Sequence, residues 1–193
     1  MEHATCEIHF TDRSRLKLLE SSTATVKARM GAMRETLGSG ETQRFNRAMV
    51  YKMISPLAQF HRDYQPLDEV IIDSNSLEVF SQVNFKGVQA AGNFFAHPAY
   101  IDGLTQAGGF VMNCNDSNDL AVEVFVNHGW ESLQLYEPLQ KEKKYKTFCH
   151  MSPGDNRKFH GDVVVFDESE KIVASYKGIV VSCSHQTETC EAN

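Results

Sequence analysis

Residues 97–114 read HPAYIDGLTQAGGFVMNC and are the most informative segment of the chain. It is largely apolar, lacks the alternation of a strand, and is rich in alanine and glycine. Pro98 suits the first position of a helix, where no backbone N–H is needed. Each glycine weakens a helix by roughly 1 kcal/mol relative to alanine. The pattern therefore predicts a helix over residues 98–114 that lies very close to a sheet.

A polar stripe runs along this expected helix. Asp102 and Gln106 are four residues apart and share a face, which Gly109 and Asn113 continue. A carboxyl in an apolar wall has a raised pKa because burial disfavours its charged form. Such a group can act as a general acid at neutral pH. Asp102 is therefore the candidate acid, with capping of the first helical turn as the alternative role.

The residues before this segment predict two helices. Apolar residues recur at helical spacing over residues 11–38, where Thr11 can cap the start, and again over residues 45–60. Pro56 should kink or break the second helix because proline removes a backbone donor. The methionine-rich stripe of the second helix, which includes Met49 and Met53, is expected to be packing surface, with a groove for a partner as the alternative. Residues 6–10 are a candidate edge strand.

Strand patterns dominate the remaining sequence. The expected strands are a short run at 70–72, a half-buried strand at 77–85, an extended segment at 121–136 that breaks near Gly129, a strand at 145–151, and a hairpin of 161–166 and 172–182. The order of elements supports an α+β domain in which a helix packs on an antiparallel sheet.

Composition argues against several classes of function. The net charge of −6, without a basic patch, argues against nucleic-acid binding. No stretch approaches the roughly 18 apolar residues of a membrane helix. The five cysteines form no CxxC pair, and the histidines and cysteines are scattered without metal-ligand spacing. We therefore expect reduced thiols, a cytoplasmic location, no membrane contact and no metal.

The motif HPxxxDxxxQ at residues 97–106 resembles the second-half motif of the dehydratase domains of polyketide and fatty acid synthases. The continuation AGGFVMN is closer still to the product template domain of non-reducing fungal polyketide synthases, although those domains commonly have a histidine at the position of Gln106. Six further stretches resemble the same domains: NRAMVY (46–51), LDEVIID (67–73), NHGWES (127–132), YEPL (136–139), MSPGD (151–155) and GDVVVF (161–166). The resemblance therefore covers residues 43–182.

This resemblance implies a hotdog fold, in which an antiparallel sheet wraps around a central helix. It assigns the chain to the second half of a double hotdog. The expected organisation is an edge strand and linker helices at 1–66, the hotdog unit at 67–184, and a polar tail at 185–193.

In the resembled family the aspartate works, across a shared substrate tunnel, with a histidine of the first hotdog in the pattern HxxxGxxxxP. None of the eight histidines here fits that pattern. His150 has Gly154 four residues on, but Phe159 stands at the proline position. We therefore expect a homodimer, a complex with a separate first-half chain, or a unit that binds acyl chains without chemistry.

The activity that the resemblance implies is that of a polyketide cyclase or dehydratase of fungal secondary metabolism. It would promote enolisation, aldol ring closure and loss of water on a poly-β-keto substrate, by acid and base alone and without a cofactor. The expected site residues are Asp102, His97 and His128 for catalysis and Gln106, Asn113, Asn127 and Trp130 for substrate binding.

Each of these residues has an expected role. Asp102 is the acid and Gln106 orients it, while the two asparagines hold an oxygen of the substrate or of a water. The base comes from His97, His128 or another subunit. Strand alternation allows only one of Asn127 and His128 to face the tunnel. Purely structural roles are the alternative for His97 and for Trp130, which suits a core or tunnel wall.

Two other functions stay open. One is a non-catalytic hotdog that binds an acyl or polyketide chain or docks on a synthase. The other is an acyl-thioester hydrolase, which ranks third because the HPxxxDxxxQ spacing belongs to dehydratases. The expected partners are a polyketide substrate, a second hotdog and, as a further candidate, a polyketide synthase. The sequence shows no obvious basic groove for a carrier protein, which favours a free substrate.

Overall fold

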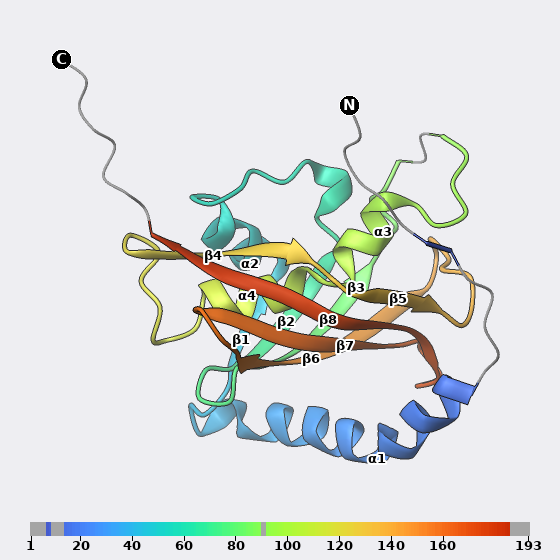
Figure 1. Ribbon diagram of the computed structural model, residues 1–193, viewed down its shortest axis with the longest axis horizontal. Coiled ribbons are helices and arrows are strands. Elements are labelled where there is room, and N and C mark those ends of the chain that lie inside the picture. Colours follow the sequence, from blue (N-terminus) through green and yellow to red (C-terminus); the bar gives the residue numbers. More distant parts are fainter. Residues whose placement is uncertain (1–6, 9–13, 90–91, 186–193) are drawn as a thin grey trace.

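The computed structural model describes residues 7–8, 14–89 and 92–185 (Figure 1). The elements are, in order, α1 (Ser14–Glu35), η1 (Thr36–Gly38), β1 (Gln43–Asn46), α2 (Arg47–Ile54), η2 (Arg62–Tyr64), β2 (Leu67–Asp73), β3 (Glu78–Asn84), α3 (Pro98–Gly103), α4 (Gln106–Asn113), β4 (Glu123–Gly129), β5 (Ser132–Leu135), β6 (Lys144–Pro153), β7 (Lys158–Phe166) and β8 (Ile172–His185). The edge strand expected at residues 6–10, the Thr11 cap and residues 186–193 of the tail lie outside the described residues.

The strands form one antiparallel sheet in the order β1-β2-β3-β6-β7-β8-β4, and β5 also pairs with β8. Figure 1 shows this sheet curling around α4, while α1 lies on the opposite side of the sheet. A curled antiparallel sheet around a central helix is the hotdog arrangement, so the expected fold class is confirmed. The expected break near Gly129 and the hairpin of β7 and β8 are confirmed as well.

The inner face of the sheet holds the larger apolar core. Helix α4 packs against β2, β3, β4 and β6. Its Phe110 is fully buried and meets Phe45 of β1 edge to face, with ring centroids 5.2 Å apart. Inward residues of the strands, such as Val70 and Val79, belong to the same cluster. The alternation of buried residues that defines a strand thus supplies the wall around the central helix.

The outer face is also buried, because α1 lies across it. Met30 and Met33 of α1 pack with Phe80, Phe148 and other outward residues of the strands. The strand expected at residues 77–85 is present as β3, but the expectation that only one of its faces is buried is wrong. The adjacent residues Val79 and Phe80 point to opposite faces and are both buried, since helices cover both sides.

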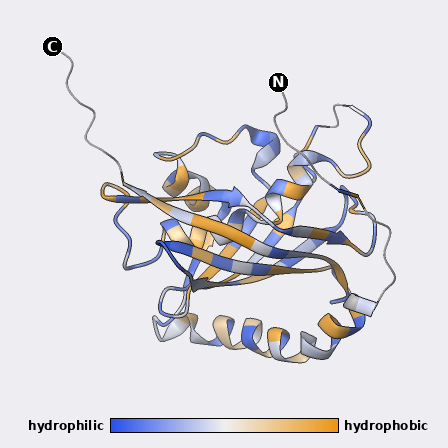
Figure 2. Cartoon of the chain, in the orientation of Figure 1, coloured by the Kyte–Doolittle hydropathy of each residue, from blue (hydrophilic) through white to orange (hydrophobic). Residues whose placement is uncertain are grey.

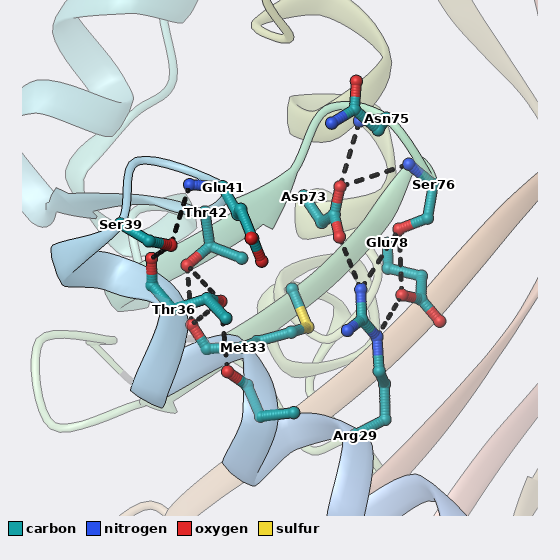
Figure 3. Close-up of polar contacts among 11 residues, drawn as sticks. Arg29, Met33, Thr36, Ser39, Glu41, Thr42, Asp73, Asn75, Ser76 and Glu78 are labelled. Atoms are coloured by element: carbon teal, nitrogen blue, oxygen red, sulfur yellow. Dashed lines mark hydrogen bonds and ion pairs between the residues drawn. The ribbon is translucent and has the colours of Figure 1, made fainter.

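Ion pairs hold α1 to the sheet. Figure 3 shows Arg29 reaching Asp73 at the end of β2 and Glu78 at the start of β3, with nitrogen–oxygen distances of 2.5 Å to each carboxylate. Arg34 pairs with Glu69 at 3.0 Å. Apolar and polar residues are interspersed along α1 (Figure 2), and its ion pairs add to the apolar contact that Met30 and Met33 make with the sheet.

The second linker helix is shorter than the helix expected over residues 45–60. The second linker helix ends at Ile54, just before Pro56, which confirms the expected break. However, Phe45 belongs to strand β1 and not to this helix. In the methionine-rich stripe of this helix, Met53 is partly buried and packs against the larger core cluster, whereas Met49 is 45% exposed.

The central helix is interrupted, contrary to the single helix expected over residues 98–114. Helix α3 ends at Gly103 and α4 begins at Gln106. The carbonyl of Asp102 accepts hydrogen bonds from both the N–H and the hydroxyl of Thr105, each at 3.0 Å. A threonine side chain that competes for a backbone carbonyl in this way disturbs regular helical bonding.

Candidate acid site around Asp102

Asp102 lies near the end of α3, and its partner Gln106 opens α4. The Gln106 amide donates from Nε2 to Oδ2 of Asp102 at 2.6 Å. Burial raises the pKa of Asp102, and the hydrogen bond from Gln106 opposes this shift without cancelling it. The two residues expected to share a face are therefore in contact, although the helix breaks between them.

Gln106 is itself held by groups from distant parts of the chain. Its Nε2 also donates to the carbonyl of Tyr64 at 2.9 Å. Its Oε1 accepts a hydrogen bond from the hydroxyl of Tyr51, on α2, at 2.8 Å. The same hydroxyl accepts from the backbone N–H of Leu67 at 3.1 Å. A continuous chain of hydrogen bonds therefore links the start of β2 to Asp102.

Tyr176 brings a second buried hydroxyl to this region. It stands on β8 and donates to the carbonyl of Ile101 at 2.8 Å. Burial raises the pKa of Tyr176, and the negative charge of Asp102 adds to the shift. The ring of Trp130 meets the Tyr176 ring edge to face, with centroids 5.5 Å apart. Trp130 is thus connected to the site through Tyr176.

Neither tyrosine is among the site residues expected from the sequence. Tyr51 ends the stretch NRAMVY, which lies in the segment expected to hold the linker helices. Tyr176 lies on an expected strand, where alternation alone would have placed it on the inner face. A search for hydroxyl groups among inward positions would have identified them as candidates.

His97 lies at the opposite end of α3 from Asp102. Its Nδ1 accepts a hydrogen bond from the N–H of Ala99 at 3.1 Å, so His97 caps the helix. Its ring lies near the rings of Phe94 and Tyr100, with centroids 5.2 and 5.4 Å away. These contacts account for His97 structurally, and its role as a base stays a prediction.

Asn113 is engaged by strand β4 rather than by Asp102. Its Nδ2 donates to the carbonyls of Gly109 and Phe125, both at 2.9 Å. Its Oδ1 accepts from the N–H of Phe125, also at 2.9 Å. Both amide protons are therefore used within the fold, and Asn113 joins the end of α4 to the edge strand.

Asn127 and His128 are both exposed on β4. Asn127 accepts a hydrogen bond from the N–H of Gly129 at 2.7 Å, and His128 Nε2 lies 2.5 Å from the hydroxyl of Ser182. The pairing of β4 with β8 is irregular between Asn127 and Gly129. This irregularity and the position of β4 at the end of the sheet explain why alternation does not bury one of the two. Their proposed roles stay predictions.

Two grooves lie on the described part of the structure, and Asp102 lines neither of them. One of about 460 Å³ lies between α1 and the outer face, where Leu19, Phe148 and His150 are among its walls. The other, of about 230 Å³, lies beside Phe125 and Phe159. Over the described residues, no three or more acidic, histidine or cysteine side chains gather to hold a metal. No helix in the same part of the chain is long and apolar enough to cross a membrane.

Known proteins similar to this chain include polyketide synthases and their dehydratase domains. The family model "Polyketide synthase dehydratase N-terminal domain" matches residues 35–189. The chain belongs to this family. It is 50% identical over 173 residues to the non-reducing polyketide synthase pgmA of Aspergillus terreus, which covers 90% of this chain and 8% of that protein. Norsolorinic acid synthase stcA of Emericella nidulans is 40% identical over 179 residues, 92% of this chain and 8% of that protein.

Solved dehydratase structures have the same fold. The dehydratase domain from the CurJ module of curacin polyketide synthase aligns with a TM-score of 0.61 at 18% identity, over 74% of this chain and 49% of that one. The dehydratase domain of PpsC from Mycobacterium tuberculosis gives 0.61 at 14% identity, over 74% and 52%. The chain thus spans about half of these domains and 8% of the curated synthases. The family model is described as an N-terminal domain, whereas HPxxxDxxxQ predicted the second hotdog, and that assignment stays a prediction.

Proposed function

We propose that this chain supplies the acid half of a polyketide cyclase or dehydratase site. The observation behind the proposal is the half-buried carboxyl of Asp102, whose pKa is raised by burial and whose Oδ2 is held by Gln106. A carboxyl that retains its proton at higher pH is suited to general acid catalysis. Its Oδ1 has no hydrogen bond from the described residues, which leaves that oxygen for a substrate.

The proposed reaction needs one acid and one base. The base takes a proton from a carbon between two carbonyl groups, and the resulting enolate attacks a third carbonyl of the same chain to close a ring. Asp102 donates its proton to that carbonyl oxygen. The base then gives up its proton and Asp102 takes one up, so both groups regain their starting states. In the following elimination the base removes the remaining proton of the same carbon while Asp102 protonates the new hydroxyl, so the C–O bond breaks, water leaves and a C=C bond forms. Gln106 keeps the carboxyl in one orientation during both steps.

The base is proposed to come from a second hotdog. Neither His97 nor His128 has a hydrogen bond or ring contact to Asp102 among the described residues. The chain covers only about half of the dehydratase domains it resembles. A second copy of this chain, or a first-half unit with the HxxxGxxxxP histidine, would complete the pair.

The second candidate is a hotdog that binds a polyketide or acyl chain without chemistry. The observation in its favour is the same lack of a base beside Asp102. Removal of the Asp102 proton should abolish turnover if the chain is an enzyme. It should leave ligand binding unchanged if the chain only binds, because binding alone does not need that proton.

The test is Asp102→Asn, with Asp155→Asn on an exposed turn as the matched control. Light scattering first establishes whether the chain is a dimer. Each variant is then assayed for water loss from a 3-hydroxyacyl thioester, alone and with the segment that precedes the matched region in a relative such as pgmA. We expect wild type and the control to be active where a second hotdog is present, and Asp102→Asn to be about 10²–10⁴-fold slower.

Retention of full activity in Asp102→Asn would contradict the acid role. Tight ligand binding without turnover in every pairing, unchanged by Asp102→Asn, would favour the binding module. Thermal unfolding of each variant checks that the substitution leaves the fold intact.

A further inference from the structure

The orientation of the Gln106 amide is fixed from both sides. The carbonyl of Tyr64 can only accept a hydrogen bond, so the group that faces it at 2.9 Å must be the NH2 of Gln106. The same NH2 faces Asp102. The amide oxygen therefore faces the hydroxyl of Tyr51, which must be the donor.

The Tyr51 hydroxyl is fixed in the same way. The N–H of Leu67 can only donate, so the Tyr51 oxygen accepts it and turns its own proton toward Gln106. The ring of Tyr51 is held at 5.9 Å from the ring of Phe60, measured between centroids. Every bond in this chain thus runs in one direction, from the backbone of β2 to the carboxylate of Asp102.

Aligned hydrogen bonds polarise one another, so a donor to the oxygen of an amide strengthens the donation from its nitrogen. In this chain of hydrogen bonds, Tyr51 is linked to Asp102 through the amide of Gln106. We propose that Tyr51 is a positioning residue, which holds the Gln106 amide so that its NH2 remains on Asp102. This role deepens the proposed acid function of Asp102, on which its relevance to catalysis rests.

Loss of the Tyr51 hydroxyl should change the pKa of Asp102 in one direction. Donation from Gln106 stabilises the ionised form of Asp102 and so lowers its pKa. Loss of the Tyr51 hydroxyl weakens that donation and makes the surroundings less polar, and both changes raise the pKa further. The other titratable groups nearby are Tyr176 and the Arg47–Asp68 pair beside Tyr51. Burial raises the pKa of both tyrosines, so neither ionises while Asp102 titrates.

The experiment is an NMR titration of the whole chain with ¹³C-labelled aspartate carboxyls, in which Asp102→Asn identifies the Asp102 signal. We expect Tyr51→Phe to shift the Asp102 titration to higher pH, and Gln106→Leu to shift it further. Tyr136→Phe is the matched control, because the Tyr136 hydroxyl likewise makes two hydrogen bonds, here to the side chains of Gln134 and Ser175, but away from Asp102. It should leave the titration unchanged.

A second variant keeps the test valid if Tyr51→Phe does not fold. Incorporation of 3-fluorotyrosine at position 51 retains the hydroxyl and makes it a stronger donor, so the titration of Asp102 should move to lower pH. An unchanged titration in both Tyr51 variants, with Gln106→Leu shifted, would overturn the positioning role. The readout needs no turnover. If Tyr51 shifts the titration as expected but Asp102→Asn retains activity, then the proposed function fails and the positioning role stands.

Discussion

The two faces of the sheet are both buried, but by different means. The inner face is covered by α2, α3 and α4, which join one large apolar cluster and enclose the polar chain from Leu67 to Asp102. Among the residues that the structure describes, α1 is the helix that covers the outer face, with a smaller cluster and ion pairs along its border. A groove of about 460 Å³ remains between α1 and the sheet.

This difference bears on where a site can form. Close packing on the inner face holds side chains in defined rotamers, which a hydrogen-bonded acid requires. Salt bridges that are partly exposed tolerate small movements and are weakened by salt. The inner face is therefore the one that can hold Asp102 in a defined orientation, and the outer face serves to keep the sheet out of water.

The largest expected effects come from removing one phenylalanine from each face. Phe110→Ala should lower the free energy of unfolding by about 3–5 kcal/mol, because close-packed neighbours cannot fill the cavity. Phe80→Ala should cost about 2–3 kcal/mol, because α1 can settle toward the sheet. Denaturant unfolding of both variants measures the difference. Equal losses, or a larger loss for Phe80→Ala, would show that α1 packs as tightly as the inner helices.

The next effect concerns how closely the central helices approach the rest of the core. A Cβ at Gly103 would lie 2.3 Å from the Cγ of Pro66, so Gly103→Ala should cost about 1–3 kcal/mol. Gly109 is the matched control, since nothing lies within 4 Å of a Cβ there, and Gly109→Ala should stabilise the protein by up to about 1 kcal/mol. Thermal unfolding of the two variants gives the comparison. A stable Gly103→Ala protein would mean that α3 and Pro66 can separate without loss.

The sequence was a good guide where the signal is local. Glycine in the central segment indicated close packing, which holds at Gly103, although Gly109 faces open space. The four-residue spacing of Asp102 and Gln106 predicted their contact, and the contact survives the helix break. The break itself depends on how Thr105 bonds to Asp102, which no periodicity reveals.

The rest of the structure depends on contacts between distant residues. Ile101 and Tyr176 are 75 residues apart, and Gln106 and Tyr51 are 55 apart, so neither pair has a signature in the local pattern. The polar stripe predicted from the sequence placed Asn113 on the same face as Asp102, but the Asn113 side chain bonds to Phe125 of β4. The position of α1 on the outer face was also hidden, since a strand with both faces buried loses the alternation that usually reports burial.

The smallest effect tests whether charges hold α1 in place. Arg29→Ala should lower the free energy of unfolding by about 1–2 kcal/mol at pH 7, between the values for exposed pairs and for hydrogen bonds to charged groups. Arg44→Ala is the matched control, because Arg44 is 63% exposed where it pairs with Glu69, and it should cost less than about 0.5 kcal/mol. Raising the salt concentration should reduce the Arg29 effect.

The Arg29 effect should also depend on pH, in a direction that the structure sets. Burial alone would raise the pKa of Asp73, but hydrogen bonds from Ser76, Arg29 and Asn75 outweigh it and hold that pKa below its ordinary value. A lowered pKa in the folded state contributes stability that is present above the unfolded pKa, about 3.9, and is lost as the pH falls through the folded value. The difference between wild type and Arg29→Ala should therefore shrink in denaturant titrations below about pH 4. If it keeps its full size there, the apolar stem of Arg29, and not its charge, holds α1 on the sheet, and the two faces are alike in what stabilises them.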